Sequence, residues 1–176
     1  MQLQLQRIIP QPLKSRIGTQ HSDVWGQVQA IQPGEKVFFQ APSGKGKSTF
    51  MHILYGLRTD YEGAAFWDDK EVRRQNDDQW AALRSKDISI VFQDLRLFSD
   101  LSVEENIAIK QSLTYAVSVE QVQQWLQFLG LEGKWHQKAE TLSYGERQRV
   151  AIIRSLLQPF RWLLLDEPFS HLDNDN

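Results

Sequence analysis

Apolar residues recur along the chain with two periods, one typical of strands and one typical of helices. Segment 3–7 alternates apolar and polar residues, which predicts a half-buried strand. Near-continuous apolar runs at 36–40, 88–92 and 162–165 are typical of parallel strands buried on both faces. Two further strands are expected at 28–31 and 64–67.

Four helices are expected between these strands, at residues 48–57, 102–113, 118–129 and 143–157. The last three begin with a serine followed three residues later by Glu or Gln, the spacing of a capping box. In segment 118–129 the apolar face consists of Val122, Trp125, Leu126 and Leu129, and Gly130 predicts the end of the helix. The stretch from about 95 to 157 is therefore mostly helical, which predicts a helical lobe inserted in an α/β core.

Composition narrows the function classes. A chain of 176 residues suits one domain, and 41% hydrophobic with 24% charged residues is ordinary for a globular protein. The net charge of -2 gives no reason to expect nucleic-acid binding. No cysteine is present, so disulfides, iron–sulfur clusters and cysteine-bound zinc are excluded. No apolar run is long enough for a membrane span, so at a membrane a partner subunit has to supply the spanning helices.

A phosphate-binding loop stands between the strand expected at 36–40 and the following helix. Its backbone N–H groups are expected to form a cradle for the phosphates of ATP. Lys47 is expected to reach the β- and γ-phosphates, while the Ser48 hydroxyl binds Mg²⁺. The pattern departs at its first glycine, which is alanine here. The loop comprises Ala41, Pro42, Ser43, Gly44, Lys45, Gly46, Lys47, Ser48 and Thr49.

Two acids follow the buried strand at 162–165. Ligands of open α/β sheets bind at the carboxyl ends of the strands, so this position suits a nucleotide site. Asp166 is expected to hold Mg²⁺, directly or through water, and Glu167 to polarise the attacking water. With the phosphate loop, the acids predict a P-loop NTPase core of the α/β class with a mostly parallel sheet and a small antiparallel β-lobe.

A third motif, Leu142-Ser-Tyr-Gly-Glu-Arg-Gln-Arg149, resembles the signature of ATP-binding cassette (ABC) proteins, usually written Leu-Ser-Gly-Gly-Gln. Gln93 lies in a segment similar to the family's Q-loop, and Asp173 in one similar to its D-loop. The five motifs stand in the family's order from about residue 27 to residue 173. The chain looks most like cassettes of the lipoprotein-releasing, macrolide-export and cell-division type.

The resemblance implies a mechanism and partners. Two cassettes would meet head to tail as a homodimer, with Ser143 and the N–H of Gly145 gripping the γ-phosphate bound by the other chain. Gln93 would contact Mg²⁺ and the attacking water, and would couple the helical lobe to a membrane-spanning permease. Asp173 would communicate between the two sites. The implied catalytic residues are Glu167, Gln93 and Lys47, and the implied location is the cytoplasmic face of the membrane.

The motifs also depart from the family pattern. Tyr144 occupies a signature position that is usually glycine, where its ring either crowds the dimer interface or is accommodated there. No aromatic residue for stacking on adenine occurs near 13–18; His21 and Trp25 are the nearest rings, and Trp25 is read as a core residue. The family continues beyond the D-loop to a switch histidine, so a C-terminally incomplete chain is expected, with core segments 1–92 and 158–176.

Several interpretations stay open from sequence. The intact Lys47, Gln93, Asp166 and Glu167 favour the ATPase subunit of a transporter. A regulatory module that binds ATP with weak or no hydrolysis is the alternative, and a soluble ABC ATPase of DNA repair or translation is a third. Ser143 could be a plain helix cap, and the stretch 147–149 a solvated helix face.

Overall fold

The structure, a computed structural model, describes residues 1–17, 22–114 and 116–168. The chain forms two compact units, Met1–Ala82 and Leu83–Asn176, and each is described by itself. The phosphate loop belongs to the first unit, and the strand-end acids belong to the second.

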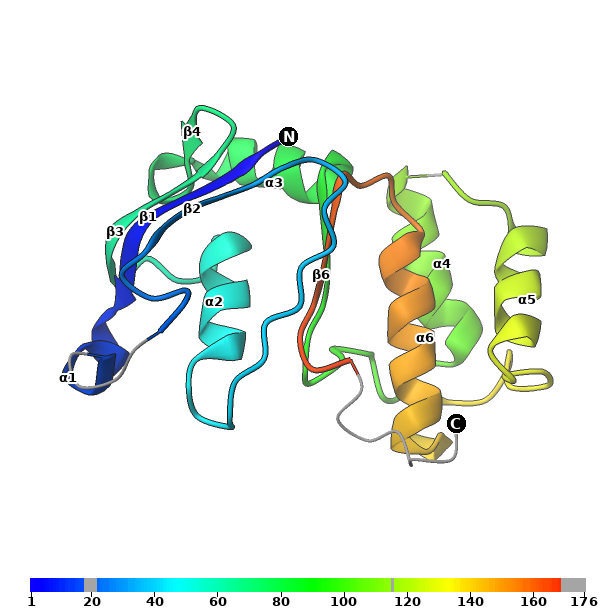
Figure 1. The fold of residues 1–176 in the computed structure, drawn as a ribbon. Helices are drawn as coiled ribbons and strands as arrows, with labels where there is room; N and C mark the ends of the chain where they lie inside the picture. The colour runs from blue at the N-terminus through cyan, green and yellow to red at the C-terminus, as the bar shows by residue number, and fades with distance from the viewer. Residues whose placement is uncertain (18–21, 115, 169–176) are drawn as a thin grey trace. The chain divides into compact units, whose positions relative to one another are not determined.

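The first unit is built on an antiparallel sheet of four strands in the order β2-β1-β3-β4 (Figure 1). The predicted strands 3–7, 28–31 and 64–67 are confirmed, the first and third in longer form. Leu3 and Leu5 of the first strand are buried, whereas Gln6 is exposed, as the alternation predicts. The bounds are β1 (Leu3–Pro10), β2 (Val28–Ile31), β3 (Tyr61–Trp67) and β4 (Lys70–Glu71).

Helix α2 (Lys47–Leu54) follows the phosphate loop and packs against this sheet. Phe50, Ile53 and Leu54 form its buried face, and the indole Nε1 of Trp67 on β3 donates to the Leu54 carbonyl at 3.0 Å. The helix is shorter than predicted, and Leu57 beyond its end is exposed. A short 3₁₀ helix (Gln11–Leu13) and α1 (Lys14–Ile17) follow β1.

The strand predicted at 36–40 is wrong. The segment is an irregular stretch of chain, and the Phe38 side chain is 78% exposed. A strand needs a neighbour that accepts its backbone hydrogen bonds, and an apolar run cannot supply one. Among the described residues, no strand pairs with this segment.

Helix α3 (Asp77–Lys86) was not among the predicted helices. Asn76 caps it, since its Oδ1 accepts from the Gln79 N–H at 2.9 Å and the Gln79 side chain accepts from the Asn76 N–H at 2.9 Å. Only Trp80 and Leu83 of the helix are buried hydrophobic residues. A 3₁₀ helix (Val72–Arg74) precedes it.

In the second unit, β5 (Ile88–Val91) and β6 (Trp162–Leu165) pair in parallel, with Ile88 opposite Trp162 and Val91 opposite Leu165. This confirms the parallel pairing predicted for these two apolar runs. Because the strands are parallel, residue 92 and residue 166 follow them at the same edge. That edge carries Gln93, Asp166 and Glu167.

The described part of the second unit also contains the helices α4 (Val103–Thr114), α5 (Val119–Phe128) and α6 (Tyr144–Leu156), with a 3₁₀ helix (Ala139–Thr141) before the last. They share one apolar core, which includes Ile107, Val122, Leu126 and Ile153. The predicted caps Ser102, Ser118 and Ser143 are all confirmed, each accepting the backbone N–H three residues later.

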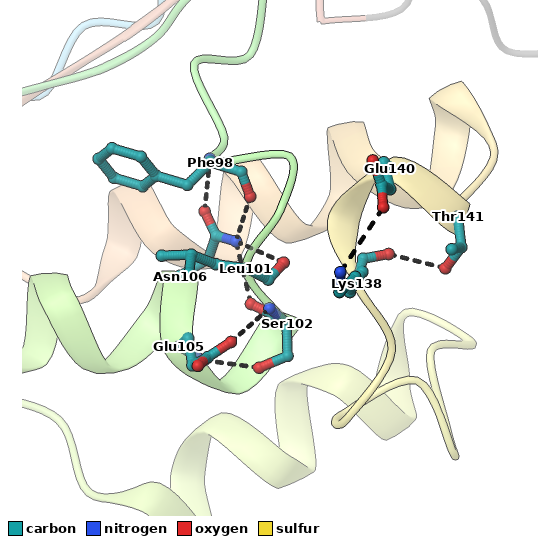
Figure 2. Close-up of polar contacts among 8 residues, drawn as sticks. All are labelled: Phe98, Leu101, Ser102, Glu105, Asn106, Lys138, Glu140 and Thr141. Atoms are coloured by element: carbon teal, nitrogen blue, oxygen red, sulfur yellow. Dashed lines mark hydrogen bonds and ion pairs between the residues drawn. The ribbon is translucent and has the colours of Figure 1, made fainter.

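The loop before α4 is held by the buried side chain of Asn106 (Figure 2). Its Oδ1 accepts from the Phe98 N–H at 2.8 Å, and its Nδ2 donates to the carbonyls of Phe98 and Ser102 at 3.0 and 2.9 Å. Ser102 and Glu105 complete a capping box at the start of the helix. Within the described ranges, no helix is both long and apolar enough to span a membrane.

Candidate functional site

The phosphate loop of the first unit is closed by its own lysine. The Nζ of Lys47, the first residue of α2, donates to the carbonyl of Ala41 at 2.8 Å and to that of Pro42 at 3.4 Å. The ammonium group therefore lies across the loop at the start of a helix, where the backbone dipoles favour an anion. Phosphate oxygens could replace these carbonyls as its acceptors.

Gly46, immediately before α2, has a backbone that only glycine adopts easily. Its φ is +95°, and a Cβ there would lie 2.5 Å from Cδ1 of Leu13. Trp25 packs on the same glycine and donates from Nε1 to the Lys45 carbonyl at 3.2 Å. Leu13 and Trp25 therefore pack against the loop and stabilise its conformation.

Ala41, which replaces the usual first glycine, fits the loop without strain. Its φ is not in the left-handed region, unlike that of Gly44 at +76°. The extra methyl group of alanine therefore costs little here.

The loop lines a cavity of about 460 Å³ within the first unit. Lys45, Lys47 and Arg16 bring positive charge to its lining, and Phe38 and Phe39 bring apolar surface. A cavity of this size that combines cations with apolar walls suits a nucleotide.

Trp25 is a core residue, as expected from sequence. It is 8% exposed and makes an edge-to-face contact with Phe50 at 5.7 Å between ring centroids. Its ring packs on Gly46 and lines the same cavity. His21, the other ring considered for adenine, lies outside the described residues.

At the strand edge of the second unit, Gln93 and Glu167 meet. The Gln93 Nε2 donates to the Glu167 carboxylate at 3.3 Å. Glu167 has φ +51°, a conformation that a non-glycine residue adopts at a cost and that is frequent at functional sites. Asp166 beside it is 3% exposed, and its N–H donates to the Val91 carbonyl at 3.0 Å.

The chemistry of this edge fits Mg²⁺, which prefers oxygen ligands. Among the described residues, no group of three or more His, Asp or Glu could hold a metal ion by itself. A nucleotide-bound magnesium needs only one or two carboxylates, because the phosphates supply the other oxygens. The buried carboxylate of Asp166 meets that requirement.

Gln148 is a member of this site that was missed from sequence. It is 3% exposed, and its Nε2 approaches the Glu167 carbonyl at 3.5 Å, at the long limit of a hydrogen bond. Reading 147–149 as a solvated helix face is therefore wrong for Gln148. Nothing in the sequence of the motif indicated that the Gln148 side chain is buried.

The signature segment begins α6. Ser143 is the N-cap and forms both arms of a capping box with Glu146, at 3.2 and 2.8 Å. The pKa of Glu146 is lowered, first because the Ser143 N–H hydrogen bonds to its carboxylate and then because Lys134 lies 3.1 Å away. Gly145 lies in the first turn of the helix, and Asp173 lies outside the described residues.

The Tyr144 side chain packs against residues of its own chain. The ring packs on the cluster of Val91, Leu95 and Ala151, and its hydroxyl donates to the Gln93 carbonyl at 2.9 Å. Both possibilities for the dimer interface stay predictions, and within the second unit the ring packs on its own chain.

The second unit thus brings together Gln93, Tyr144, Gln148 and Glu167, with Asp166 adjacent. The first unit brings together the loop residues around Lys47. These two groups are the parts of the predicted site that the structure places.

Comparison with known proteins identifies the family. The ABC transporter family profile matches residues 28–170. The aliphatic sulfonates import ATP-binding protein of Bacillus anthracis is 37% identical over 159 residues, covering 85% of this chain and 60% of the relative. The lipoprotein-releasing system ATP-binding protein of Nitratidesulfovibrio vulgaris is 37% identical, covering 81% of this chain and 63% of the relative.

The macrolide export ATP-binding/permease protein of Aggregatibacter actinomycetemcomitans is also 37% identical, over 82% of this chain and 23% of its own length. The chain therefore spans less than two thirds of each of these relatives.

Solved structures agree with this assignment. A dimeric bacterial ABC transporter cassette matches with a TM-score of 0.79 and 29% identity over 97% of this chain and 76% of that one. A dimeric post-hydrolysis cassette bound to ADP and phosphate matches with a TM-score of 0.78 and 27% identity, over 98% of this chain and 76% of that one. The fold is that of these cassettes, and the chain belongs to the ABC transporter family.

Proposed function

We propose that this chain is the ATP-binding subunit of an ABC transporter and that it hydrolyses ATP to power transport. The observation that carries the proposal is the loop at Ala41–Thr49, which opens on a cavity of about 460 Å³ and holds the Lys47 ammonium beside it. Such a loop recognises the phosphates, with N–H groups and a lysine both directed at negative charge.

Mg²⁺ would be held by Ser48 and Asp166, together with the phosphates and Gln93. Within this site Glu167 would accept hydrogen bonds from the attacking water, and the Gln93 amide would keep its carboxylate in place. Bound magnesium would withdraw charge from the phosphates. The hydrogen bond between Gln93 and Glu167 supports this assignment of roles.

The relatives support a proposal for the partners. Two solved structures of one cassette are dimeric, and one relative is an ATP-binding/permease protein. We therefore propose a head-to-tail homodimer in which Ser143 and Gly145 of one chain contact the nucleotide of the other, with a permease anchoring the pair at the cytoplasmic face of the membrane. The position of Ser143 at a helix N-terminus supports its contact with an anion.

Two measurements on one preparation distinguish the transporter ATPase from the alternative, an ATP-binding module without turnover. Isothermal titration calorimetry with Mg²⁺–ATP measures binding, and a phosphate-release assay measures hydrolysis. Binding with sustained phosphate release supports the transporter ATPase, and binding without release supports the regulatory module. Absence of binding would contradict both. Co-purification of a membrane-spanning subunit tests the permease partner separately.

A further inference from the structure

Tyr144 connects the first turn of α6 to the strand-end acids. Its hydroxyl donates to the backbone carbonyl of Gln93 at 2.9 Å, and the side chain of Gln93 donates to Glu167 at 3.3 Å. Two hydrogen bonds through one intermediate residue thus join the signature helix to the carboxylate that the proposed function assigns to hydrolysis.

The tyrosine ring is fixed, so its hydroxyl has a defined position. The ring packs on Val91, Leu95 and Ala151, and the Arg147 guanidinium lies 5.9 Å from its centroid. Packing on these residues and the nearby guanidinium restrict rotation of the side chain. The hydroxyl is therefore preorganised to bond the Gln93 carbonyl.

The turn that follows Gln93 is strained and needs such support. Leu95 and Arg96 have φ values of +59° and +48°, two consecutive non-glycine residues in the left-handed region. Strain of this kind persists only where the surroundings hold it. Arg96 stacks over the Phe92 ring at 3.6 Å, which closes the turn on itself.

Helix α6 holds the same turn at a second point. Arg154, ten residues after Tyr144 on this helix, donates from Nη2 to the Leu95 carbonyl at 2.9 Å. Two side chains of one rigid helix therefore bind two carbonyls of one turn, those of Gln93 and Leu95.

We propose that Tyr144 is a positioning residue, which together with Arg154 holds the 93–96 turn so that the Gln93 amide faces the Glu167 carboxylate. The signature motif that the segment resembles has glycine here, which has no side chain to make this bond. This inference rests on the proposed function for its catalytic consequence. The physical link between α6 and the turn does not depend on it.

The link is tested without nucleotide by amide hydrogen exchange with mass spectrometry. Tyr144→Phe removes one oxygen atom and keeps the ring packed. Loss of one hydrogen bond worth about 1 kcal/mol should raise the exchange rate of peptides covering 92–97 roughly five-fold. Tyr61→Phe makes the same chemical change in the first unit and should leave these peptides unaffected. Unchanged exchange in Tyr144→Phe would overturn the proposal.

Arg154→Met provides an independent variant of similar length that cannot donate to the Leu95 carbonyl. It should also raise exchange at 92–97, and the double variant should deviate from additivity because both side chains hold one turn. The proposal would be overturned if the effects of the two substitutions were additive and exchange rose equally in all peptides of the second unit. That result would show that the two residues act through global stability.

The catalytic consequence is tested by steady-state hydrolysis. In Tyr144→Phe we expect kcat to fall about five-fold while KM for ATP changes less than about two-fold, because the lost bond positions Gln93 and not the nucleotide. A faster-exchanging turn with unchanged kcat would overturn the positioning role. If the wild-type chain shows no turnover, the proposed function fails, and the exchange experiment still decides whether the link exists.

Discussion

The ammonium of Lys47 lies 2.8 Å from the carbonyl oxygen of Ala41, so the first and seventh residues of the phosphate loop are joined directly. The loop is thus preorganised by the group that would bind phosphate, with Leu13 and Trp25 packed behind Gly46. The packing behind Gly46 remains when phosphate replaces the carbonyls as the acceptor of Lys47, and a preorganised loop lowers the cost of binding a ligand.

Replacing Lys47 by alanine should weaken ATP binding between about ten-fold and about a hundred-fold, the loss expected for one hydrogen bond to a charged group. Lys45, in the same loop and lining the same cavity, is the matched control, because its alanine variant removes an equal charge. Titration with a fluorescent ATP analogue compares the two. Equal losses in both variants would show that the loop attracts ATP by charge alone.

A change of one methyl group should be tolerated at Ala41 and should destabilise the loop at Gly46. Ala41→Gly should alter ATP affinity less than about three-fold, because this backbone is not left-handed. Gly46→Ala should lower the free energy of unfolding by at least about 1 kcal/mol, since its φ is +95° and the new Cβ meets Leu13. Urea unfolding with ATP titration measures both. A tolerated Gly46→Ala would contradict the loop geometry.

Removal of magnesium should expose the role of Asp166. In the wild type we expect EDTA to weaken ATP binding roughly ten-fold, whereas in Asp166→Asn magnesium should make little difference. Asp87→Asn is the control, since Asp87 precedes β5 at the opposite end of the strand and pairs with Arg161 at 2.8 Å. It should keep the wild-type response. A magnesium effect that persists in Asp166→Asn would remove this residue from the metal site.

Acid should weaken the start of α6. The pKa of Glu146 lies below its ordinary value of 4.5 in the folded chain, so its stabilisation is complete above that value and is lost as the pH falls through the lowered pKa. At pH 7 Glu146→Gln should therefore cost about 0.5 kcal/mol of unfolding free energy. As the pH falls through the lowered pKa, the difference between variant and wild type should shrink towards zero. A difference independent of pH would contradict the charge-based capping.

Sequence patterns predicted a strand correctly where the apolar residues are buried and a neighbouring strand pairs with the segment. The alternation at 3–7 and the apolar run at 162–165 both became strands because neighbouring strands are present to complete their hydrogen bonds. The run at 36–40 has three consecutive apolar residues, yet Phe38 is exposed and the segment is not a strand. Hydrophobicity measures the tendency to be buried and does not identify a hydrogen-bonding neighbour.

The missed features have specific causes. Helix α3 carried a capping signal at Asn76 and Gln79, but its few buried apolar residues gave a weak helical period. Gln148 was read as part of a solvated helix face, and only the tertiary structure places it against the Glu167 backbone. The bond from Tyr144 to Gln93 spans 51 residues, so no local pattern could predict it.

The most direct test of the account compares phosphate release from Mg²⁺–ATP by the wild-type chain and by Glu167→Gln, with nucleotide binding measured on the same samples. Glutamine has the size of glutamate and lacks the negative charge that polarises water. We expect sustained release by the wild type, a loss of about a hundred-fold or more in the variant, and ATP affinity within about three-fold. Hydrolysis by Glu167→Gln at the wild-type rate would contradict the assignment of this strand-end acid to catalysis.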